Sequence, residues 1–206
     1  VFKLNKNKFN FQNTLKEIIF NKFEGQLDTG EMMDALLNKA YKSNIKIINN
    51  VSVKTYEDIG PSVKVHTNQF AISCNKLFIA TNGFSESIIQ EKVVPARAQV
   101  LITKPIKNLK VIGTFHFQQG YYYFRNIDDR ILLGGGRNLD FHIENTNQFG
   151  VTDTIQSKLE QLLTDVILPQ SNFEIEQRWS GIMGIGNKKT TITKQLSNNV
   201  YCGVRL

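Results

Sequence analysis

The sequence has no long apolar run and very little cysteine. No apolar stretch in its 206 residues approaches the roughly 18–20 residues that a membrane-spanning helix needs. The first residues, VFKLNKNKFNF, have neither the apolar core nor the small-residue cleavage site of a signal peptide. With only Cys74 and Cys202 and no CxxC pair, we expect no disulfide framework, two buried thiols and a cytoplasmic protein.

The common short catalytic motifs are missing as well. There is no GxSxG or HExxH, and the three histidines lack metal-ligand spacing, so no metal site is predicted. The run Gly134-Gly135-Gly136 is followed by Arg137 and not by the residues of a phosphate loop, which favours a tight strand exit. No GxGxxG fingerprint of dinucleotide binding occurs in the sequence.

The net charge is +7, from 25 basic and 18 acidic residues. A basic protein can bind nucleic acid or acidic ligands. Here the lysines are scattered singly, and no run of five or more basic residues exists. We therefore expect no nucleic-acid partner, and we keep nucleic-acid binding only as a third alternative.

Periodicity predicts the first half of the chain as one helix and several strands. LDTGEMMDALLNKAYKSN reads as a helix with Asp28 as its N-cap, an apolar stripe that includes Leu36 and Leu37, and Asn44 at its end. SVKVHTNQFAISC alternates on both sides of a turn and predicts a hairpin. The run Leu77 to Ala80 is too hydrophobic for an edge strand, and Thr81-Asn82-Gly83 ends it abruptly.

After Pro95 the sequence predicts an antiparallel meander with a hairpin turn around Asp128. A helix over VTDTIQSKLEQLLTDVILP follows, with a stop at Pro169 and the apolar stripe Ile155, Leu159, Leu162, Leu163 and Val166. In GYYYFRN, Tyr121, Tyr123 and Arg125 fall on one face of a strand, where they could supply phenols and a guanidinium to a pocket. A half-buried aromatic sheet face explains the same pattern. If the strands are neighbours, Arg97 and Arg137 could converge with Arg125 on an anionic ligand.

Several segments, in this order, resemble the D-amino-acid/glycine oxidase-like (DAO) family of FAD-dependent oxidoreductases. KLFIATNGFS is similar to the family's "viATnGxs" strand, and VVPARAQVLIT to its "vvPxrgQvl" strand. YYYFRNIDDRILLGGGR is similar to the "Yyxrxxdgrill-Ggxr" hairpin, EIEQRWSGIMGIG to "xxxWxGixxxt", and NNVYCGVRL to "nvyxaxGxxg". Together with FEGQLDTGEMMDALLNKAYKSNIKIINNVSV, these segments cover nearly all of residues 24–206.

The resemblance implies an FAD site and its residues. The strand end Ala80, Thr81, Asn82 and Gly83 would lie against the FAD pyrophosphate, Val51 and Val53 near the adenine, and Gly203 and Arg205 near the flavin ring. On the substrate side we expect Tyr121, Tyr123, Arg125 and Arg137. The family's N-terminal GxGxxG unit and final helix are not in this sequence. We therefore expect an internal fragment, with FAD bound by the full-length protein and absent from the fragment.

The sequence thus predicts a mixed α+β fold. Residues 26–92, with 196–206 returning to them, would form part of an FAD-binding domain, and residues 93–195, joined by 1–25, an antiparallel-sheet substrate-binding domain with flanking helices. The parent would oxidise a C–N bond of an amine or amino-acid-like substrate by hydride transfer to FAD, with no catalytic residue assigned. The alternative is a non-catalytic module that binds an anionic small molecule or a protein partner. The oligomeric state is left open.

Overall fold

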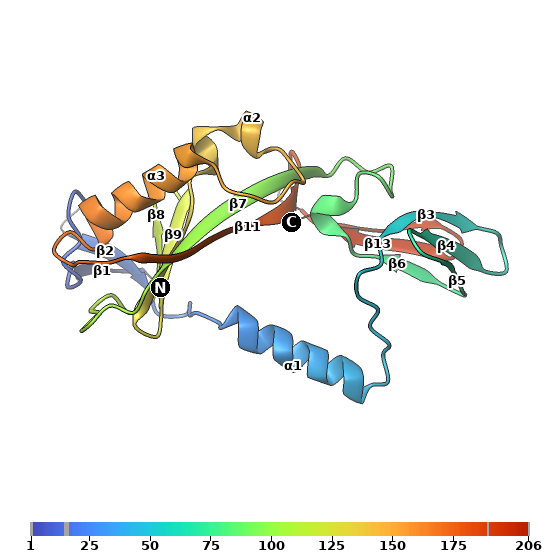
Figure 1. The fold of residues 1–206 in the computed structure, drawn as a ribbon, viewed down its shortest axis with the longest axis horizontal. Coiled ribbons are helices and arrows are strands. Elements are labelled where there is room, and N and C mark those ends of the chain that lie inside the picture. The colour runs from blue at the N-terminus through green and yellow to red at the C-terminus, as the bar shows by residue number, and fades with distance from the viewer. Residues whose placement is uncertain (1, 15–16, 189, 206) are drawn as a thin grey trace. The chain divides into compact units, whose positions relative to one another are not determined.

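The computed structural model describes residues 2–14, 17–188 and 190–205 and confirms a mixed α+β fold (Figure 1). The helices are α1 (Thr29–Lys42), α2 (Phe141–Glu144) and α3 (Asp153–Leu162). The strands are β1 (Phe2–Lys6), β2 (Glu17–Asn21), β3 (Val53–Asp58), β4 (Val63–Thr67), β5 (Ala71–Cys74), β6 (Leu77–Ile79), β7 (Val94–Thr103), β8 (Thr114–Phe117), β9 (Tyr122–Ile127), β10 (Arg130–Gly135), β11 (Ile175–Ile185), β12 (Ile192–Ser197) and β13 (Val200–Val204). None of the helices in these described ranges is long and apolar enough to cross a membrane.

The chain divides into two compact units. Unit 1 contains residues 1–27, 97–144 and 148–181, and unit 2 contains residues 28–96, 145–147 and 182–206. The boundaries between them fall inside β7 and β11, so each of these strands begins in one unit and ends in the other.

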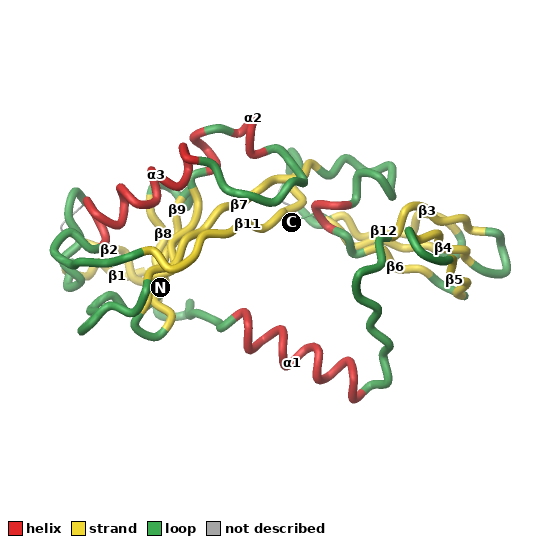
Figure 2. Tube along the Cα trace, in the orientation of Figure 1, coloured by secondary structure: helices red, strands yellow, loops and turns green. Residues whose placement is uncertain are grey.

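A five-stranded sheet organises unit 1, and Figure 2 draws its strands in yellow. The strand order is β11-β7-β10-β9-β8. The pairs β8–β9, β9–β10 and β10–β7 are antiparallel. The predicted hairpin turn is confirmed: β9 and β10 pair from Ile127↔Arg130 onward, and Asp128 takes a left-handed φ of 47°. The predicted meander holds for β8, β9 and β10, whereas β7 joins β10 at the other side.

One face of this sheet packs against α3. Tyr122 and Phe124 of β9 are buried with Ile131 and Leu133 of β10, because side chains alternate between the two faces of a strand. The predicted helix and its apolar stripe are confirmed, and the stripe is buried against these strands: Ile155, Leu159, Leu162, Leu163 and Val166. A π-helical turn over Leu163–Ile167 continues α3 to the predicted stop at Pro169.

Unit 2 contains two three-stranded sheets, ordered β12-β13-β6 and β3-β4-β5. The predicted hairpin is confirmed as the antiparallel pair β4–β5. Apolar side chains from both sheets form one core, which includes Val63 and Val65 of β4, Ile79 of β6, and Val200 and Cys202 of β13. Strands β13 and β6 are parallel, in the register Tyr201↔Phe78, although they lie far apart in the sequence.

The expectation that residues 77–80 could not form an edge strand is wrong for the described chain. Strand β6 has a partner on one side only, and Phe78 is 61% exposed. Its apolar character has a different explanation. Ile79 is buried in the core on one face, while on the other face the Phe78 ring covers Gly203 of β13, where a β-carbon would lie 2.9 Å from it.

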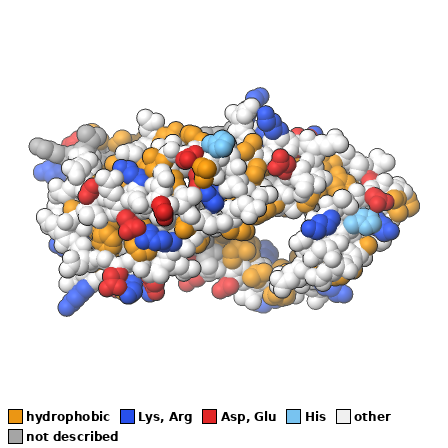
Figure 3. All heavy atoms as spheres, turned by 45° about the horizontal axis from the view of Figure 1, so that its top comes forward, with side chains coloured by type: hydrophobic (Ala, Val, Ile, Leu, Met, Phe, Trp, Pro, Cys, Tyr) orange, Lys and Arg blue, Asp and Glu red, His pale blue; other side chains and the backbone are white. Residues whose placement is uncertain are grey.

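Helix α1 begins and ends where the sequence predicts. The Asp28 carboxylate accepts a hydrogen bond from the Glu31 N–H at 3.0 Å, and Asn44 has a left-handed φ of 56°. The helix buries none of its residues, however, so Leu36 and Leu37 of its apolar stripe stay exposed. Such hydrophobic side chains recur on the surface among the charged ones (Figure 3).

Candidate functional site

The carboxyl ends of β6 and β13 meet at one edge of their sheet because the two strands are parallel. The segment Ala80–Gly83 follows β6, and Arg205 follows β13. The Asn82 side-chain oxygen accepts a hydrogen bond from the Arg205 backbone N–H at 3.2 Å. The structure thus brings together two groups of predicted cofactor-binding residues that are more than a hundred positions apart in the sequence.

Local hydrogen bonds shape the turn that leaves β6. The Ser85 hydroxyl donates to the Asn82 carbonyl oxygen at 2.5 Å and lies 3.0 Å from the Thr81 hydroxyl. A β-carbon on Gly83 would lie 2.7 Å from the Met183 carbonyl oxygen, so only glycine lets these two backbone segments approach so closely. Ala80, directly after the strand, is exposed. This edge is therefore tightly built and carries small residues.

Gly203 and Arg205 make different contacts at this edge. The Phe78 ring fills the space beside Gly203. Arg205 has a left-handed φ of 66°, and its guanidinium donates to the Thr190 carbonyl oxygen at 2.9 Å and to the Thr190 hydroxyl at 3.1 Å. The Arg205 side chain therefore holds the loop after β11, and its backbone faces Asn82.

The donor set of this edge fits a dinucleotide cofactor such as FAD. In sheets with parallel strands, such ligands bind outside the carboxyl ends of the strands, where small residues allow the cofactor to approach the backbone. Exposed Ala80 and the Thr81 hydroxyl have the size and the chemistry for that contact. Val51 and Val53 are not brought to this edge by any contact among the described residues, since Val53 begins β3 and pairs with Thr67 in the other sheet.

The face of the five-stranded sheet opposite α3 carries two of the residues predicted for the substrate. Tyr123 pairs with Gly134, and Arg125 pairs with Leu132, which places both side chains on the face opposite buried Tyr122. We call this the open face, because Figure 1 shows α3 and α2 on the other side of these strands. Tyr121 precedes β9 and is exposed.

Tyr123 lies flat on the open face. A β-carbon on Gly134 would come within 2.6 Å of the Tyr123 phenol oxygen and 2.5 Å of Val100, so the ring crosses the sheet over a position that must have no side chain. Burial raises the pKa of Tyr123 above its ordinary value. At neutral pH this phenol is therefore an uncharged hydrogen-bond donor.

Arg125 is already bonded to the backbone of its own unit. Its guanidinium donates to the Leu27 carbonyl oxygen at 2.5 Å. On β8, Thr114 pairs with Arg125, and its hydroxyl donates to the Gln26 side chain at 3.3 Å. The segment that precedes α1 is thus tied to the edge of the open face. A guanidinium has five N–H donors, and this bond uses one of them.

The predicted convergence of three arginines is wrong for Arg97. Arg97 lies on the α3 side of β7, since its guanidinium donates to both oxygens of the buried Glu144 carboxylate at 3.0 and 2.8 Å. Burial opposes the ionisation of Glu144, yet hydrogen bonds from Arg97 and Gln99 keep its pKa below the usual value. The charge of Arg97 is therefore compensated, and Arg97 and Arg125 point to opposite faces.

Arg137 lies in the 3₁₀ turn Arg137–Leu139 that follows β10, with its guanidinium carbon 4.8 Å above the Phe141 ring. Burial lowers its pKa. Of the four residues predicted for the substrate, the structure thus places Tyr123 and Arg125 on one face of β9, Tyr121 just before β9, and Arg137 in the turn after β10.

Sequence reasoning missed a buried polar network on the α3 side. The Gln99 side chain bonds to Glu144, Thr152 and Gln156 at 2.9 to 3.1 Å, and Arg178 of β11 continues the network to Gln156. Alternation then places Trp179, the only tryptophan, on the open face. The spacing of Arg97 and Gln99 was a signal for the network, but it does not reveal which face the helix covers.

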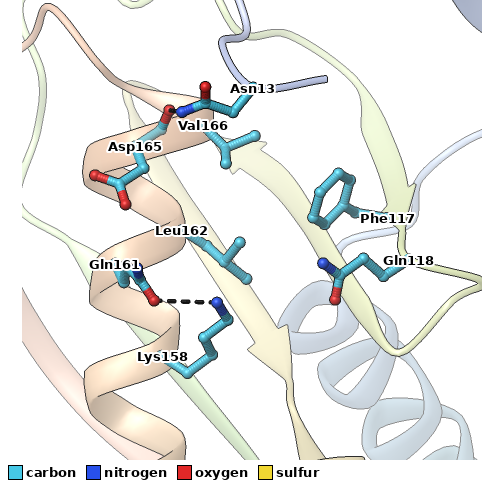
Figure 4. A pocket seen from close by; sticks show the side chains of 8 residues that line it. All are labelled: Asn13, Phe117, Gln118, Lys158, Gln161, Leu162, Asp165 and Val166. Atoms are coloured by element: carbon cyan, nitrogen blue, oxygen red, sulfur yellow. Dashed lines mark hydrogen bonds between the residues drawn. The ribbon is translucent and has the colours of Figure 1, made fainter. Parts of the chain in front are cut away.

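A groove of about 200 Å³ lies on the α3 side of unit 1 (Figure 4). Its apolar floor is Phe117, Leu162 and Val166, and its rim includes Lys158, whose ammonium donates to Gln161 at 3.0 Å. It contains none of the predicted site residues.

Comparison with known proteins supports a single family. The model of the family described as FAD dependent oxidoreductase (DAO) matches residues 7–204, and no curated protein matches the chain. L-proline dehydrogenase from P. horikoshii has 22% identity and a TM-score of 0.76, over 92% of this chain and 53% of that one. Glycine oxidase from Bacillus cereus has 14% identity and a TM-score of 0.77, over 95% and 55%.

NikD, an amino acid oxidase essential for nikkomycin biosynthesis, has 12% identity and a TM-score of 0.79, over 100% of this chain and 61% of that one. At these identities the three structures share the fold with this chain, and the chain spans little more than half of their length. Since the family model matches almost every residue, the chain belongs to the FAD dependent oxidoreductase (DAO) family.

Proposed function

We propose that this chain supplies the substrate-binding part, and a portion of the FAD-binding part, of an enzyme that oxidises a C–N bond of an amine or amino-acid-like substrate. The observation that carries the proposal is the meeting of Thr81-Asn82-Gly83 with Arg205 at the carboxyl ends of two parallel strands. The names of three similar structures, a proline dehydrogenase, a glycine oxidase and an amino acid oxidase, support the substrate class.

In this proposal unit 2 holds FAD through the edge described above, with Ala80 to Gly83 and the backbone of Arg205 as its contacts, whereas the Phe78 ring covers the predicted contact Gly203. FAD would supply the hydride acceptor. Since the GxGxxG cradle is not in this sequence, the residues here provide one part of the site, and we expect this chain alone to hold FAD poorly. Unpaired Cys74 and Cys202 are compatible with a cytoplasmic location, which we also propose.

The open face would bind and orient the substrate. The remaining N–H donors of Arg125 suit a carboxylate, and the neutral Tyr123 phenol can donate to a second polar atom. Trp179 of β11 adds an apolar surface to the same face, with β7 and β10 lying between β11 and β9. Tyr121 precedes β9 and Arg137 lies in the turn after β10, so the proposal assigns substrate binding mainly to Tyr123 and Arg125, which share one face of β9.

The test is anaerobic mixing of the full-length flavoprotein with a panel of amino acids and secondary amines, followed by the flavin absorption. Bleaching by an amine, and none by the matching α-hydroxy acid, supports C–N oxidation. Bleaching by hydroxy acids alone contradicts it. Arg125→Gln should raise KM for a carboxylate substrate more than it lowers kcat, with Arg130→Gln, at the far end of the β9–β10 hairpin, as the matched control.

The rival function is an anionic-ligand module without turnover. It shares the open face but needs no flavin. A full-length protein that purifies without flavin, takes up none when FAD is added, and still binds an anionic ligand with a change in tryptophan fluorescence that Trp179→Phe removes would favour the module.

A further inference from the structure

The ribbon formed by β1 and β2 exposes large apolar side chains on both faces. The register pairs Leu4 with Ile19, and alternation adds Phe2 to the same face; these three residues are 67%, 72% and 67% exposed. On the other face Phe20, opposite Lys3, is 48% exposed. Exposed apolar groups that cluster in this way mark an interaction surface.

The ribbon and its flanks are also basic. Residues 1–24 contain five lysines and two glutamates, a net charge of +3. Lys3 and Lys6 lie on β1, and the ammonium groups of Lys8 and Lys22 lie 5.3 and 4.9 Å from the neighbouring rings of Phe9 and Phe23. A long lysine side chain next to an exposed ring, such as Lys22 next to Phe23, can keep its charge in water while the ring enters an apolar layer.

We propose that the β1–β2 ribbon docks the protein on the surface of an anionic lipid bilayer. A flat protein partner would cover one face of a ribbon, whereas the interface of a bilayer surrounds both. The lysines complement the negative charge of the lipid headgroups. Among the described residues the two-stranded ribbon has no further strand partner. Backbone N–H and C=O groups at its outer edges cannot enter hydrocarbon, so the ribbon lies no deeper than the boundary between headgroups and acyl chains.

The test is co-sedimentation of the full-length protein with vesicles. Vesicles of phosphatidylcholine and phosphatidylglycerol in equal parts are compared with vesicles of phosphatidylcholine alone. We expect binding to the mixed vesicles only, weakened by added salt. Lys3→Gln with Lys6→Gln should reduce the affinity about 25-fold, from about fivefold for each lysine. Leu4→Ser with Ile19→Ser should reduce it at least about tenfold, from the apolar area withheld from the bilayer.

The matched control is Ile112→Ser, which removes an equally exposed apolar side chain, 66% exposed, outside the ribbon and should leave binding unchanged. Circular dichroism spectra and thermal midpoints verify that each variant folds. Failure to bind the mixed vesicles, equal binding to both vesicle types, or equal loss with the control overturns the proposal. So does sedimentation equilibrium showing that Leu4 and Ile19 instead hold two copies of the chain together.

Discussion

The glycine that ends β10 offers the sharpest test of the fold around the open face. Gly135 has a φ of 119°, and a β-carbon there would overlap the Tyr121 carbonyl oxygen and lie 2.8 Å from the Tyr122 α-carbon. Both neighbours are backbone atoms of the paired strand, so no side-chain rotation can relieve the contact. Gly135→Ala must therefore distort the β9–β10 hairpin.

The expected cost has two parts. Holding a residue with a side chain in this region of φ costs about 1–3 kcal/mol, and forcing an extra carbon into a packed site costs about 1–3 kcal/mol. The free energy of unfolding should thus fall by about 2–6 kcal/mol. In a chain of this size each kcal/mol lowers the melting temperature by about 2–4 °C, so the midpoint should drop by at least about 4 °C.

The assay is thermal and urea denaturation followed by circular dichroism, with Gly181→Ala as the matched control. Gly181 also lies in a strand of this sheet, but a β-carbon there meets no atom within 4 Å. The control should change stability by less than about 1 kcal/mol. If Gly135→Ala has the same melting temperature as the wild type, the close approach of the two strands is not as described.

Three further predictions concern other parts of the chain. Glu144→Ala leaves buried Arg97 without its counter-charge and should lower the free energy of unfolding in urea by about 3–5 kcal/mol. A loss below about 1 kcal/mol would mean that the pair is hydrated. Hydrogen bonds from the Ser197 hydroxyl, the Asn199 N–H and the Asn199 amide lower the pKa of Asp58 to about 2. Because the unfolded pKa is about 4, the stability it adds is present above pH 4 and lost as the pH falls toward 2. The thermal midpoint should fall as the pH decreases from 4 toward 2, and Asp58→Asn should reduce this fall. An unchanged pH dependence in the variant would contradict the assignment. Gln118 and Gln119 both have a left-handed φ, 49° and 59°, in the β8–β9 turn. Replacing them by Asn-Gly should raise the unfolding free energy by about 1–2 kcal/mol, and a destabilised variant would refute that turn geometry.

Local patterns carried the sequence predictions that the structure confirms. The N-cap of α1 depends on residues three positions apart, the buried stripe of α3 on a period of 3.6, and the turn at Asp128 on four consecutive residues. Each of these features is decided by near neighbours in the sequence, so no knowledge of the fold is needed to read it.

Features that depend on which distant segments meet could not be read in the same way. Alternation in β7 places Arg97 on one face of the sheet. Only the packing of the helices decides that this face is covered and that Glu144 lies there to pair with Arg97. The exposure of Phe78 depends on β6 being a sheet edge. The flat position of Tyr123 depends on its register with Gly134, which no local pattern contains.

The central claim is that this chain is part of an enzyme whose FAD lies at the edge formed by β6 and β13. The most direct measurement is the visible absorption spectrum of the full-length protein as purified, next to that of Gly83→Val, whose side chain would meet the Met183 carbonyl oxygen and displace the turn. Flavin bands in the wild type, with at least a tenfold loss of FAD in a variant that still folds, are predicted. A full-length protein without flavin bands, even after FAD is added, would contradict the account.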